Sequence, residues 1–191
     1  MKVTEIRIDV VRREVPSLRL NDQRRQMGGT FEHGVLRVVT DDGIEGNCTV
    51  GQRGGGARDL MDQIVREAGP LIVRHDPADR EWLWARVNQM TGNGEALSAA
   101  WSCVDVALWD IAGKAAGMPV HALLGTHRRE VAVYATYPPR QSTPEGYAAE
   151  AEELKSQGFT AYKVHPGAMP AQDVCRMVDA VRDVKREKGL E

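Results

Sequence analysis

The sequence lacks several features that would assign a protein to a class at once. Among its 191 residues are three cysteines, Cys48, Cys103 and Cys175, which are far apart and match no metal or redox spacing. We therefore expect reduced thiols in a cytoplasmic protein. No apolar run approaches the length of a membrane span, and the N-terminus alternates charged and apolar residues instead of forming a leader.

An excess of charge of one sign is also missing. The 25 basic and 27 acidic residues give a net charge of −2 and are spread along the whole chain. This balance favours neither a nucleic acid nor an anionic membrane as a partner. Hydrophobic residues make up 42% of the chain, which is enough to bury real cores.

The first 50 residues are rich in strand signals. Alternating apolar and polar residues in IRIDV predict a strand with one buried face. The polar segment 17–34 is predicted to be a loop, and GVLRVVTDDGIEGNCTV predicts a hairpin that turns at Asp42-Gly43. GQRGGG, residues 51–56, lacks the GK[ST] ending of a phosphate loop and is predicted to be a flexible loop.

Helical patterns follow these strands. Two apolar stripes predict short helices, and a third predicts a long helix from about Glu95 to Ala116 that Gly117 ends. Strands followed by helices indicate an α+β domain, which we assign to residues 1–127.

The pattern changes again in residues 128–191. A buried strand is predicted at 131–136, then a helix ended by Gly158, a second strand FTAYKVH, and a second helix at 170–188. This β-α-β-α order predicts parallel strands with right-handed crossovers. An eight-unit barrel of this kind takes about 250 residues, so we expect the chain to end within this domain.

The segment AYKVHPG contains the candidate catalytic residues. Lys163 and His165 are predicted to share one face at the C-terminal end of a strand, where α/β folds place their ligands. An ammonium group can polarise an anion, and it disfavours a neighbouring imidazolium, which keeps a neutral base available. By themselves, however, the two residues are better explained as a surface lysine and a histidine that is hydrogen-bonded near a strand end. Arg25, His33 and Arg53 are candidate binding residues in polar loops, although single loop residues are mostly solvated.

The order of these elements resembles the enolase superfamily, specifically its mandelate racemase and acid-sugar dehydratase branch. The resemblance covers the whole chain and is carried by VLRVVTDDGIEGNCTVG, SAAWSCVDVALWDIAGKAAGMPVHALLG, VAVYAT and GFTAYKVH. It implies a capping domain over the open end of a TIM-like barrel, with 17–34 and 51–56 helping to choose the substrate. It also implies a Mg²⁺ ion that binds the substrate carboxylate while a base removes the α proton.

The resemblance extends to the candidate residues with one departure. Many relatives have Lys-x-Lys at the end of the second barrel strand; Lys163 matches the first lysine, and His165 stands where the second would be. The acidic metal ligands of the family come from the next three barrel strands, which lie outside these 191 residues. We therefore expect no metal ligand within this chain.

These observations lead to three hypotheses. The first is the N-terminal part of a Mg²⁺-dependent acid-sugar dehydratase, with Lys163 holding the carboxylate, His165 acting as base or acid, and Arg25, His33 and Arg53 suiting a polyhydroxylated acid. The second is a racemase, epimerase or cycloisomerase of the same superfamily. The third is a non-catalytic fragment, because a Lys/His pair alone cannot stabilise an enolate. The resemblance also implies a homo-oligomer.

Overall fold

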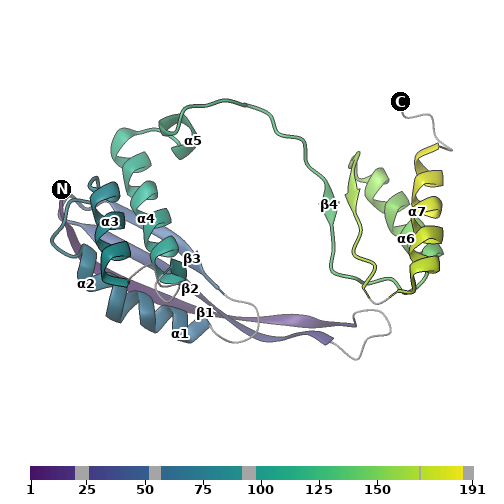
Figure 1. Ribbon diagram of the computed structural model, residues 1–191, viewed down its shortest axis with the longest axis horizontal. Coiled ribbons are helices and arrows are strands. Elements are labelled where there is room, and N and C mark those ends of the chain that lie inside the picture. Colours follow the sequence, from purple (N-terminus) through teal and green to yellow (C-terminus); the bar gives the residue numbers. More distant parts are fainter. Residues whose placement is uncertain (20–25, 52–56, 92–97, 168, 187–191) are drawn as a thin grey trace. The chain divides into compact units, whose positions relative to one another are not determined.

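The computed structural model describes residues 1–19, 26–51, 57–91, 98–167 and 169–186 (Figure 1). The chain divides into two compact units. The first comprises Met1–Glu14 and Thr30–His127, and the second comprises Val15–Gly29 and Arg128–Glu191. Each unit has its own secondary structure and buried residues.

A three-stranded sheet forms the first layer of the first unit. Its strands are β1 (Val3–Arg19), β2 (Gln26–Thr40) and β3 (Glu45–Val50), in the order β1-β2-β3. Residues 15–19 of β1 and 26–29 of β2 are assigned to the second unit. β2 and β3 are antiparallel, with Val39 opposite Glu45. Gly43 has a φ of 78° in the turn between them, a conformation that favours glycine. The hairpin predicted at Asp42-Gly43 is confirmed.

The prediction of a polar loop over 17–34 is wrong for most of its length. β1 continues to Arg19, and β2 already begins at Gln26, while residues 20–25 lie outside the described part of the chain. Polar side chains bridge the two strands near this segment: Thr30 Oγ1 donates to Glu14 Oε1 over 2.6 Å. Cross-strand polar pairs can stabilise strands without a buried face, so polarity alone was a misleading signal for a loop.

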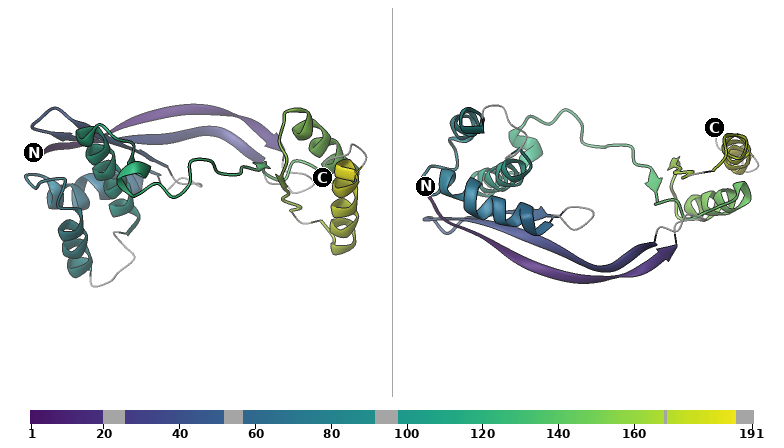
Figure 2. Two further views of the ribbon diagram at one scale, coloured as in Figure 1. Left: turned by 90° about the horizontal axis from the view of Figure 1, so that it is seen from above. Right: turned by 60° about the horizontal axis from the view of Figure 1, so that its bottom comes forward.

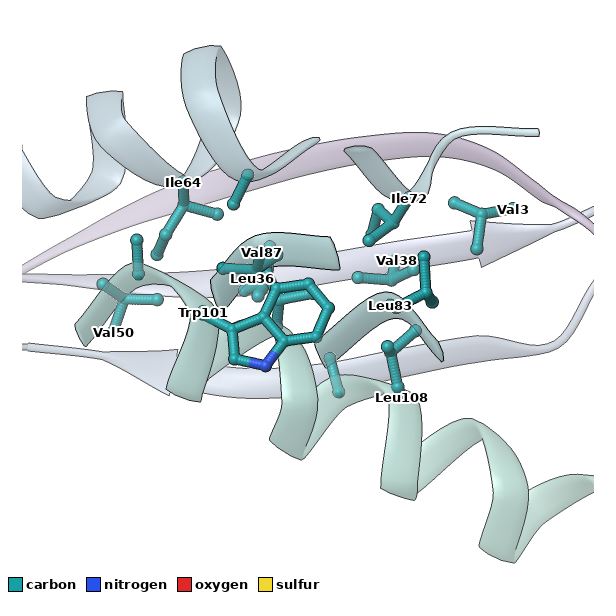
Figure 3. Packing of buried hydrophobic residues seen from close by; sticks show 14 of the residues in the cluster. Val3, Leu36, Val38, Val50, Ile64, Ile72, Leu83, Val87, Trp101 and Leu108 are labelled. Carbon is teal, nitrogen blue, oxygen red and sulfur yellow. The ribbon is translucent and has the colours of Figure 1, made fainter. Parts of the chain in front are cut away.

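Helices cover one face of this sheet (Figure 2). They are α1 (Ala57–Gln63), the π-helical segment η1 (Ile64–Ala68), α2 (Gly69–Ile72), α3 (Arg80–Thr91) and α4 (Ser98–Ala116). The short helix α5 (Val120–Leu123) follows α4 and packs against it. The core lies between sheet and helices, where Leu36 and Val38 pack with Ile64, Trp101 and Leu108 (Figure 3).

The close approach of β3 to α4 holds the two layers together. A Cβ atom on Gly46 would lie 2.1 Å from the carbonyl oxygen of Ala107, so only glycine fits there. At the next residue, the Asn47 amide donates to Asp110 Oδ2 over 2.8 Å, and Lys114 Nζ donates to the Glu45 carbonyl over 2.6 Å. Side chains of α4 thus satisfy backbone groups of β3.

The second unit follows the predicted β-α-β-α order. It contains β4 (Ala135–Thr136), α6 (Pro144–Ser156), β5 (Tyr162–Lys163) and α7 (Ala171–Arg186), and β4 and β5 are parallel. Thr143 caps α6 by accepting a hydrogen bond from the Gly146 amide, and Gly158, with a φ of 91°, follows its last turn. α6 and α7 lie side by side (Figure 2).

The strand predicted at 131–136 is shorter and less buried than expected. Only Ala135 and Thr136 are in β4, while Val131 and Val133 are 71% and 66% exposed. Residues 131–134 take no part in the pairing of β4 with β5, so they lack the neighbouring strand that would help to bury them. None of the helices in those ranges combines the length and the apolar composition needed to cross a membrane.

Candidate functional site

The candidate site begins where the two parallel strands end. Thr136 is the last residue of β4 and pairs in register with Lys163, the last residue of β5. The carboxyl ends of parallel strands meet at one edge of a sheet, so both residues lie at the edge where α/β folds bind ligands. His165 follows two residues after Lys163, beyond the regular strand.

Thr136 connects the two candidate catalytic residues. Its hydroxyl donates to the backbone carbonyl of Lys163 over 3.2 Å, and the same oxygen lies 3.1 Å from Nε2 of His165. The link therefore uses the backbone of Lys163 and the ring of His165. It places the imidazole at the edge formed by the two strand ends.

The ammonium group of Lys163 lies near an aromatic ring. Its side chain is exposed, and Nζ lies 5.9 Å from the centre of the Tyr134 ring, within the range of a cation–π contact. Because β5 ends at Lys163, the strand alternation used to place Lys163 and His165 on one face does not extend to His165. Their connection through Thr136 was not predicted.

A buried tyrosine fixes the chain after β5. Tyr147, on α6, is 1% exposed, and its hydroxyl donates to the His165 carbonyl over 2.6 Å. Burial raises the pKa of the Tyr147 hydroxyl, and the negative charge of Glu150 raises it further. This group therefore remains a protonated donor. The contact restrains the His165 backbone where it leaves the strand.

A buried carboxylate lies one helical turn further along α6. Glu150 is 3% exposed; Arg140 Nε donates to its Oε1 over 2.9 Å, and the Tyr162 hydroxyl donates to Oε2 over 2.9 Å. Arg140 also donates to Oε1 through Nη2, and its guanidinium carbon Cζ lies 3.6 Å from the centre of the Tyr137 ring. Burial first, and then the hydrogen bond to Glu150, raise the pKa of Tyr162, which keeps its hydroxyl protonated.

Sequence reasoning missed Thr136, Tyr147 and Glu150. Thr136 could have been found by extending the parallel-strand rule to the first strand as well as the second. Tyr147 shares a helical stripe with Ala151 and Leu154, which marks it as buried, but its bond to His165 depends on the fold. No local pattern distinguishes Glu150 from the other acidic residues of α6.

The three residues predicted to bind the substrate from polar loops are only partly described. His33 lies on β2 rather than in a loop, and it is half-buried. A Cβ atom on Gly51 would lie 2.8 Å from His33 Nδ1, so the ring packs against that backbone. Arg25 and Arg53 lie outside the described residues. His33 belongs to the first unit and Lys163 and His165 to the second.

A charged cluster lies next to His33. Glu32 accepts from Arg58 Nε over 2.6 Å and from Arg12 Nε over 2.7 Å, which connects β2 with α1 and β1. The hydrogen bonds from Arg58 and then Arg12 lower the pKa of Glu32 to about 2. This carboxylate is therefore ionised and paired with two arginines.

The described residues do not form a metal centre. They contain no group of three or more His, Cys, Asp or Glu side chains that could hold an ion. Their site offers a hydroxyl, an ammonium and an imidazole. Groups of these kinds are able to bind an anion and to exchange a proton.

Comparison with known proteins identifies the family. The N-terminal domain model of the mandelate racemase / muconate lactonizing enzyme family matches residues 14–125. The chain belongs to the enolase superfamily. Its first unit is the N-terminal capping domain of that superfamily, an antiparallel sheet with helices. The predicted family and fold class are confirmed.

Two curated enolase-superfamily relatives are similar over much of the chain. One, a D-galactonate dehydratase family member of Catenulispora acidiphila, is 40% identical over 139 residues, 70% of this chain and 31% of its own length. Another, the arabinonate dehydratase of Saccharolobus solfataricus, is 30% identical over 186 residues, 88% of this chain and 48% of its own length. The chain thus spans half or less of the length of these two relatives.

Solved enolase-superfamily structures match the fold. A superfamily member from Polaromonas sp. is 28% identical with a TM-score of 0.81, covering 96% of this chain and 49% of its own. D-glucarate dehydratase from Agrobacterium tumefaciens, complexed with magnesium, is 25% identical with a TM-score of 0.75, covering 96% of this chain and 51% of its own.

Proposed function

We propose that this chain is the N-terminal part of an acid-sugar dehydratase. The observation that carries the proposal is the grouping of Lys163 and His165 with Thr136 at the carboxyl ends of two parallel strands. Relatives named arabinonate dehydratase and D-mannonate dehydratase support a sugar acid as the substrate. The capping domain is the first unit, and β4 to α7 are the first two units of a TIM-like barrel.

In the proposed reaction Lys163 binds the substrate carboxylate through its ammonium group. His165 moves the proton, either as the base that takes it from the carbon next to the carboxylate or as the acid at the leaving hydroxyl. When the C–H bond breaks, its electrons form a carbon–carbon double bond, and the hydroxyl on the next carbon leaves with a proton as water. Arg25, His33 and Arg53 remain our candidates for contacts with the substrate hydroxyls.

Magnesium is part of the proposal. The magnesium-bound D-glucarate dehydratase supports it, and its role would be to stabilise the negative charge that develops on the carboxylate oxygens. The described residues contain no cluster to hold it, so its ligands would lie outside them. We also propose a cytoplasmic homo-oligomer, which would cover the exposed Val131 and Val133.

The test is a screen of the complete gene product against a library of sugar acids with Mg²⁺. We expect dehydration of at least one acid and loss of that activity in the Lys163→Ala variant, with Lys2→Ala, another exposed lysine, as control. Turnover of no sugar acid, together with racemisation or cycloisomerisation of another acid, would reject the proposal. The DNA sequence after codon 191 is a second test, with an acidic residue expected at the end of a third strand.

The alternative is an isomerase of the same superfamily. A 3,6-anhydro-α-L-galactonate cycloisomerase of Streptomyces coelicolor, 28% identical over 187 residues, favours it. Exchange of the α proton for solvent deuterium without loss of water would distinguish it from a dehydratase. If the 191-residue chain is itself the whole protein, intact mass, magnesium titration and assay should show neither metal binding nor turnover, which is the result expected of a non-catalytic fragment.

A further inference from the structure

The hydroxyl group of Thr136 has two neighbours but only one hydrogen to donate. One neighbour, the Lys163 carbonyl at 3.2 Å, can only accept a hydrogen bond. The other, Nε2 of His165 at 3.1 Å, can donate or accept according to the tautomer of the ring. Both contacts are hydrogen bonds only if Thr136 donates to the carbonyl and accepts from an Nε2–H group.

We propose that Thr136 holds His165 in the Nε2–H tautomer, so that Nδ1 is the atom that takes up and releases the proton. In the opposite arrangement Thr136 would donate its one hydrogen to Nε2. No hydrogen would then remain between the Thr136 oxygen and the Lys163 carbonyl. Thr136 is therefore a positioning residue for His165. This inference rests on the proposed function for its catalytic meaning, but the tautomer itself does not depend on any activity.

The two protonation states of His165 make this arrangement useful. A neutral ring of this tautomer and a doubly protonated ring both donate from Nε2, so the bond to Thr136 is the same in each. Only Nδ1 gains or loses a proton during a reaction cycle. Thr136 then needs no rotation between the two states, and the ring keeps one orientation.

Two further features hold the residue that carries this ring. The Tyr147 hydroxyl donates to the His165 carbonyl over 2.6 Å, so the backbone is fixed from the side of α6. Pro166 follows His165 and restricts the preceding residue to extended backbone conformations. With the backbone restrained and Nε2 bound to Thr136, the direction in which Nδ1 points is determined.

Nuclear magnetic resonance of the chain labelled with ¹⁵N-histidine tests this inference. The spectrum is recorded at a pH about two units above the ordinary imidazole value, and the signals of His165 are identified among the five histidines by their loss in His165→Gln. We expect a proton on Nε2 and a bare Nδ1. Thr136→Val should raise the exchange of the Nε2 proton with water by roughly tenfold, whereas Thr136→Ser, which keeps the hydroxyl, should not.

A proton on Nδ1 of the wild-type ring would overturn the inference, as would an exchange rate that Thr136→Val leaves unchanged. The tautomer is decided without the Thr136 variants, so the test survives if one of them fails to fold. Failure here is also distinguishable from failure of the proposed function. The spectrum needs no substrate, and a complete protein that dehydrates sugar acids could do so with either tautomer.

Discussion

The two units differ in what holds their residues in place. In the first, apolar side chains from sheet and helices form one cluster, and Leu36, Ile64 and Leu108 are fully buried. In the second, buried polar groups organise the strand ends: Glu150 binds Arg140 and Tyr162. Apolar burial thus dominates the first unit, whereas in the second a buried carboxylate also ties α6 to Tyr162, the residue before Lys163.

The chain allows each unit to be followed separately. All four tryptophans, Trp82, Trp84, Trp101 and Trp109, are in the first unit, and all four tyrosines, Tyr134, Tyr137, Tyr147 and Tyr162, are in the second. Urea unfolding monitored by tryptophan and by tyrosine signals therefore reports on the two units individually.

The largest effect is expected in the apolar core of the first unit. Leu108→Ala should lower the free energy of unfolding by about 3 kcal/mol, because it removes a fully buried side chain and leaves a cavity. The control is Leu124→Ala, which removes the same atoms from a side chain that is 64% exposed and should change stability by less than about 0.5 kcal/mol. Equal effects in the tryptophan-detected transition would contradict the described core.

A smaller effect is expected from the buried carboxylate of the second unit. Glu150→Gln removes the negative charge that pairs with Arg140. We expect it to lower the free energy of unfolding, measured in the tyrosine-detected transition, by about 2 kcal/mol. This is less than for a fully buried pair because Arg140 is partly solvated. Glu152→Gln, an exposed change on the same helix, is the control. If both variants unfold like the wild type, the polar network does not organise this unit.

Removal of one hydroxyl should have a still smaller effect. Tyr147→Phe keeps the buried ring but loses the hydrogen bond to the His165 carbonyl. We expect this change to lower the free energy of unfolding by about 1 kcal/mol. Tyr134→Phe removes a hydroxyl from a side chain that is 54% exposed and should be nearly neutral. Both are compared by urea unfolding monitored by circular dichroism, and a Tyr147→Phe variant as stable as the control would show that the hydroxyl does not secure this turn.

The smallest effect is a pH dependence in the first unit. Arg58 and Arg12 lower the pKa of Glu32 from 4.5 to about 2 in the folded state, so the stabilisation is fully present above pH 4.5 and is lost as the pH falls toward 2. Glu32→Gln should flatten this part of the stability profile in acid titrations followed by tryptophan fluorescence. The control is Glu67→Gln, an exposed change on η1. If stability depends on pH as steeply in Glu32→Gln as in Glu67→Gln, the assignment is contradicted.

The sequence predicted features that depend on local chemistry. Gly43 in the β2–β3 turn and Gly158 after α6 were recognised because glycine favours the backbone conformation that each position adopts. The exposure of Val131 was not predicted, because burial depends on which elements cover a strand. The roles of Thr136 and Tyr147 were also missed, since each bonds to a residue that only the fold brings near.

The central claim is that His165 transfers a proton in the complete protein. The most direct test measures kcat for the sugar acid that the complete gene product dehydrates, comparing His165→Gln with His127→Gln, a change at an exposed histidine of the same chain. We predict that His165→Gln lowers kcat by roughly 10²- to 10⁴-fold, the usual contribution of a general acid or base, while His127→Gln leaves it unchanged. A His165→Gln enzyme that turns over its substrate as fast as the His127→Gln control would contradict the claim.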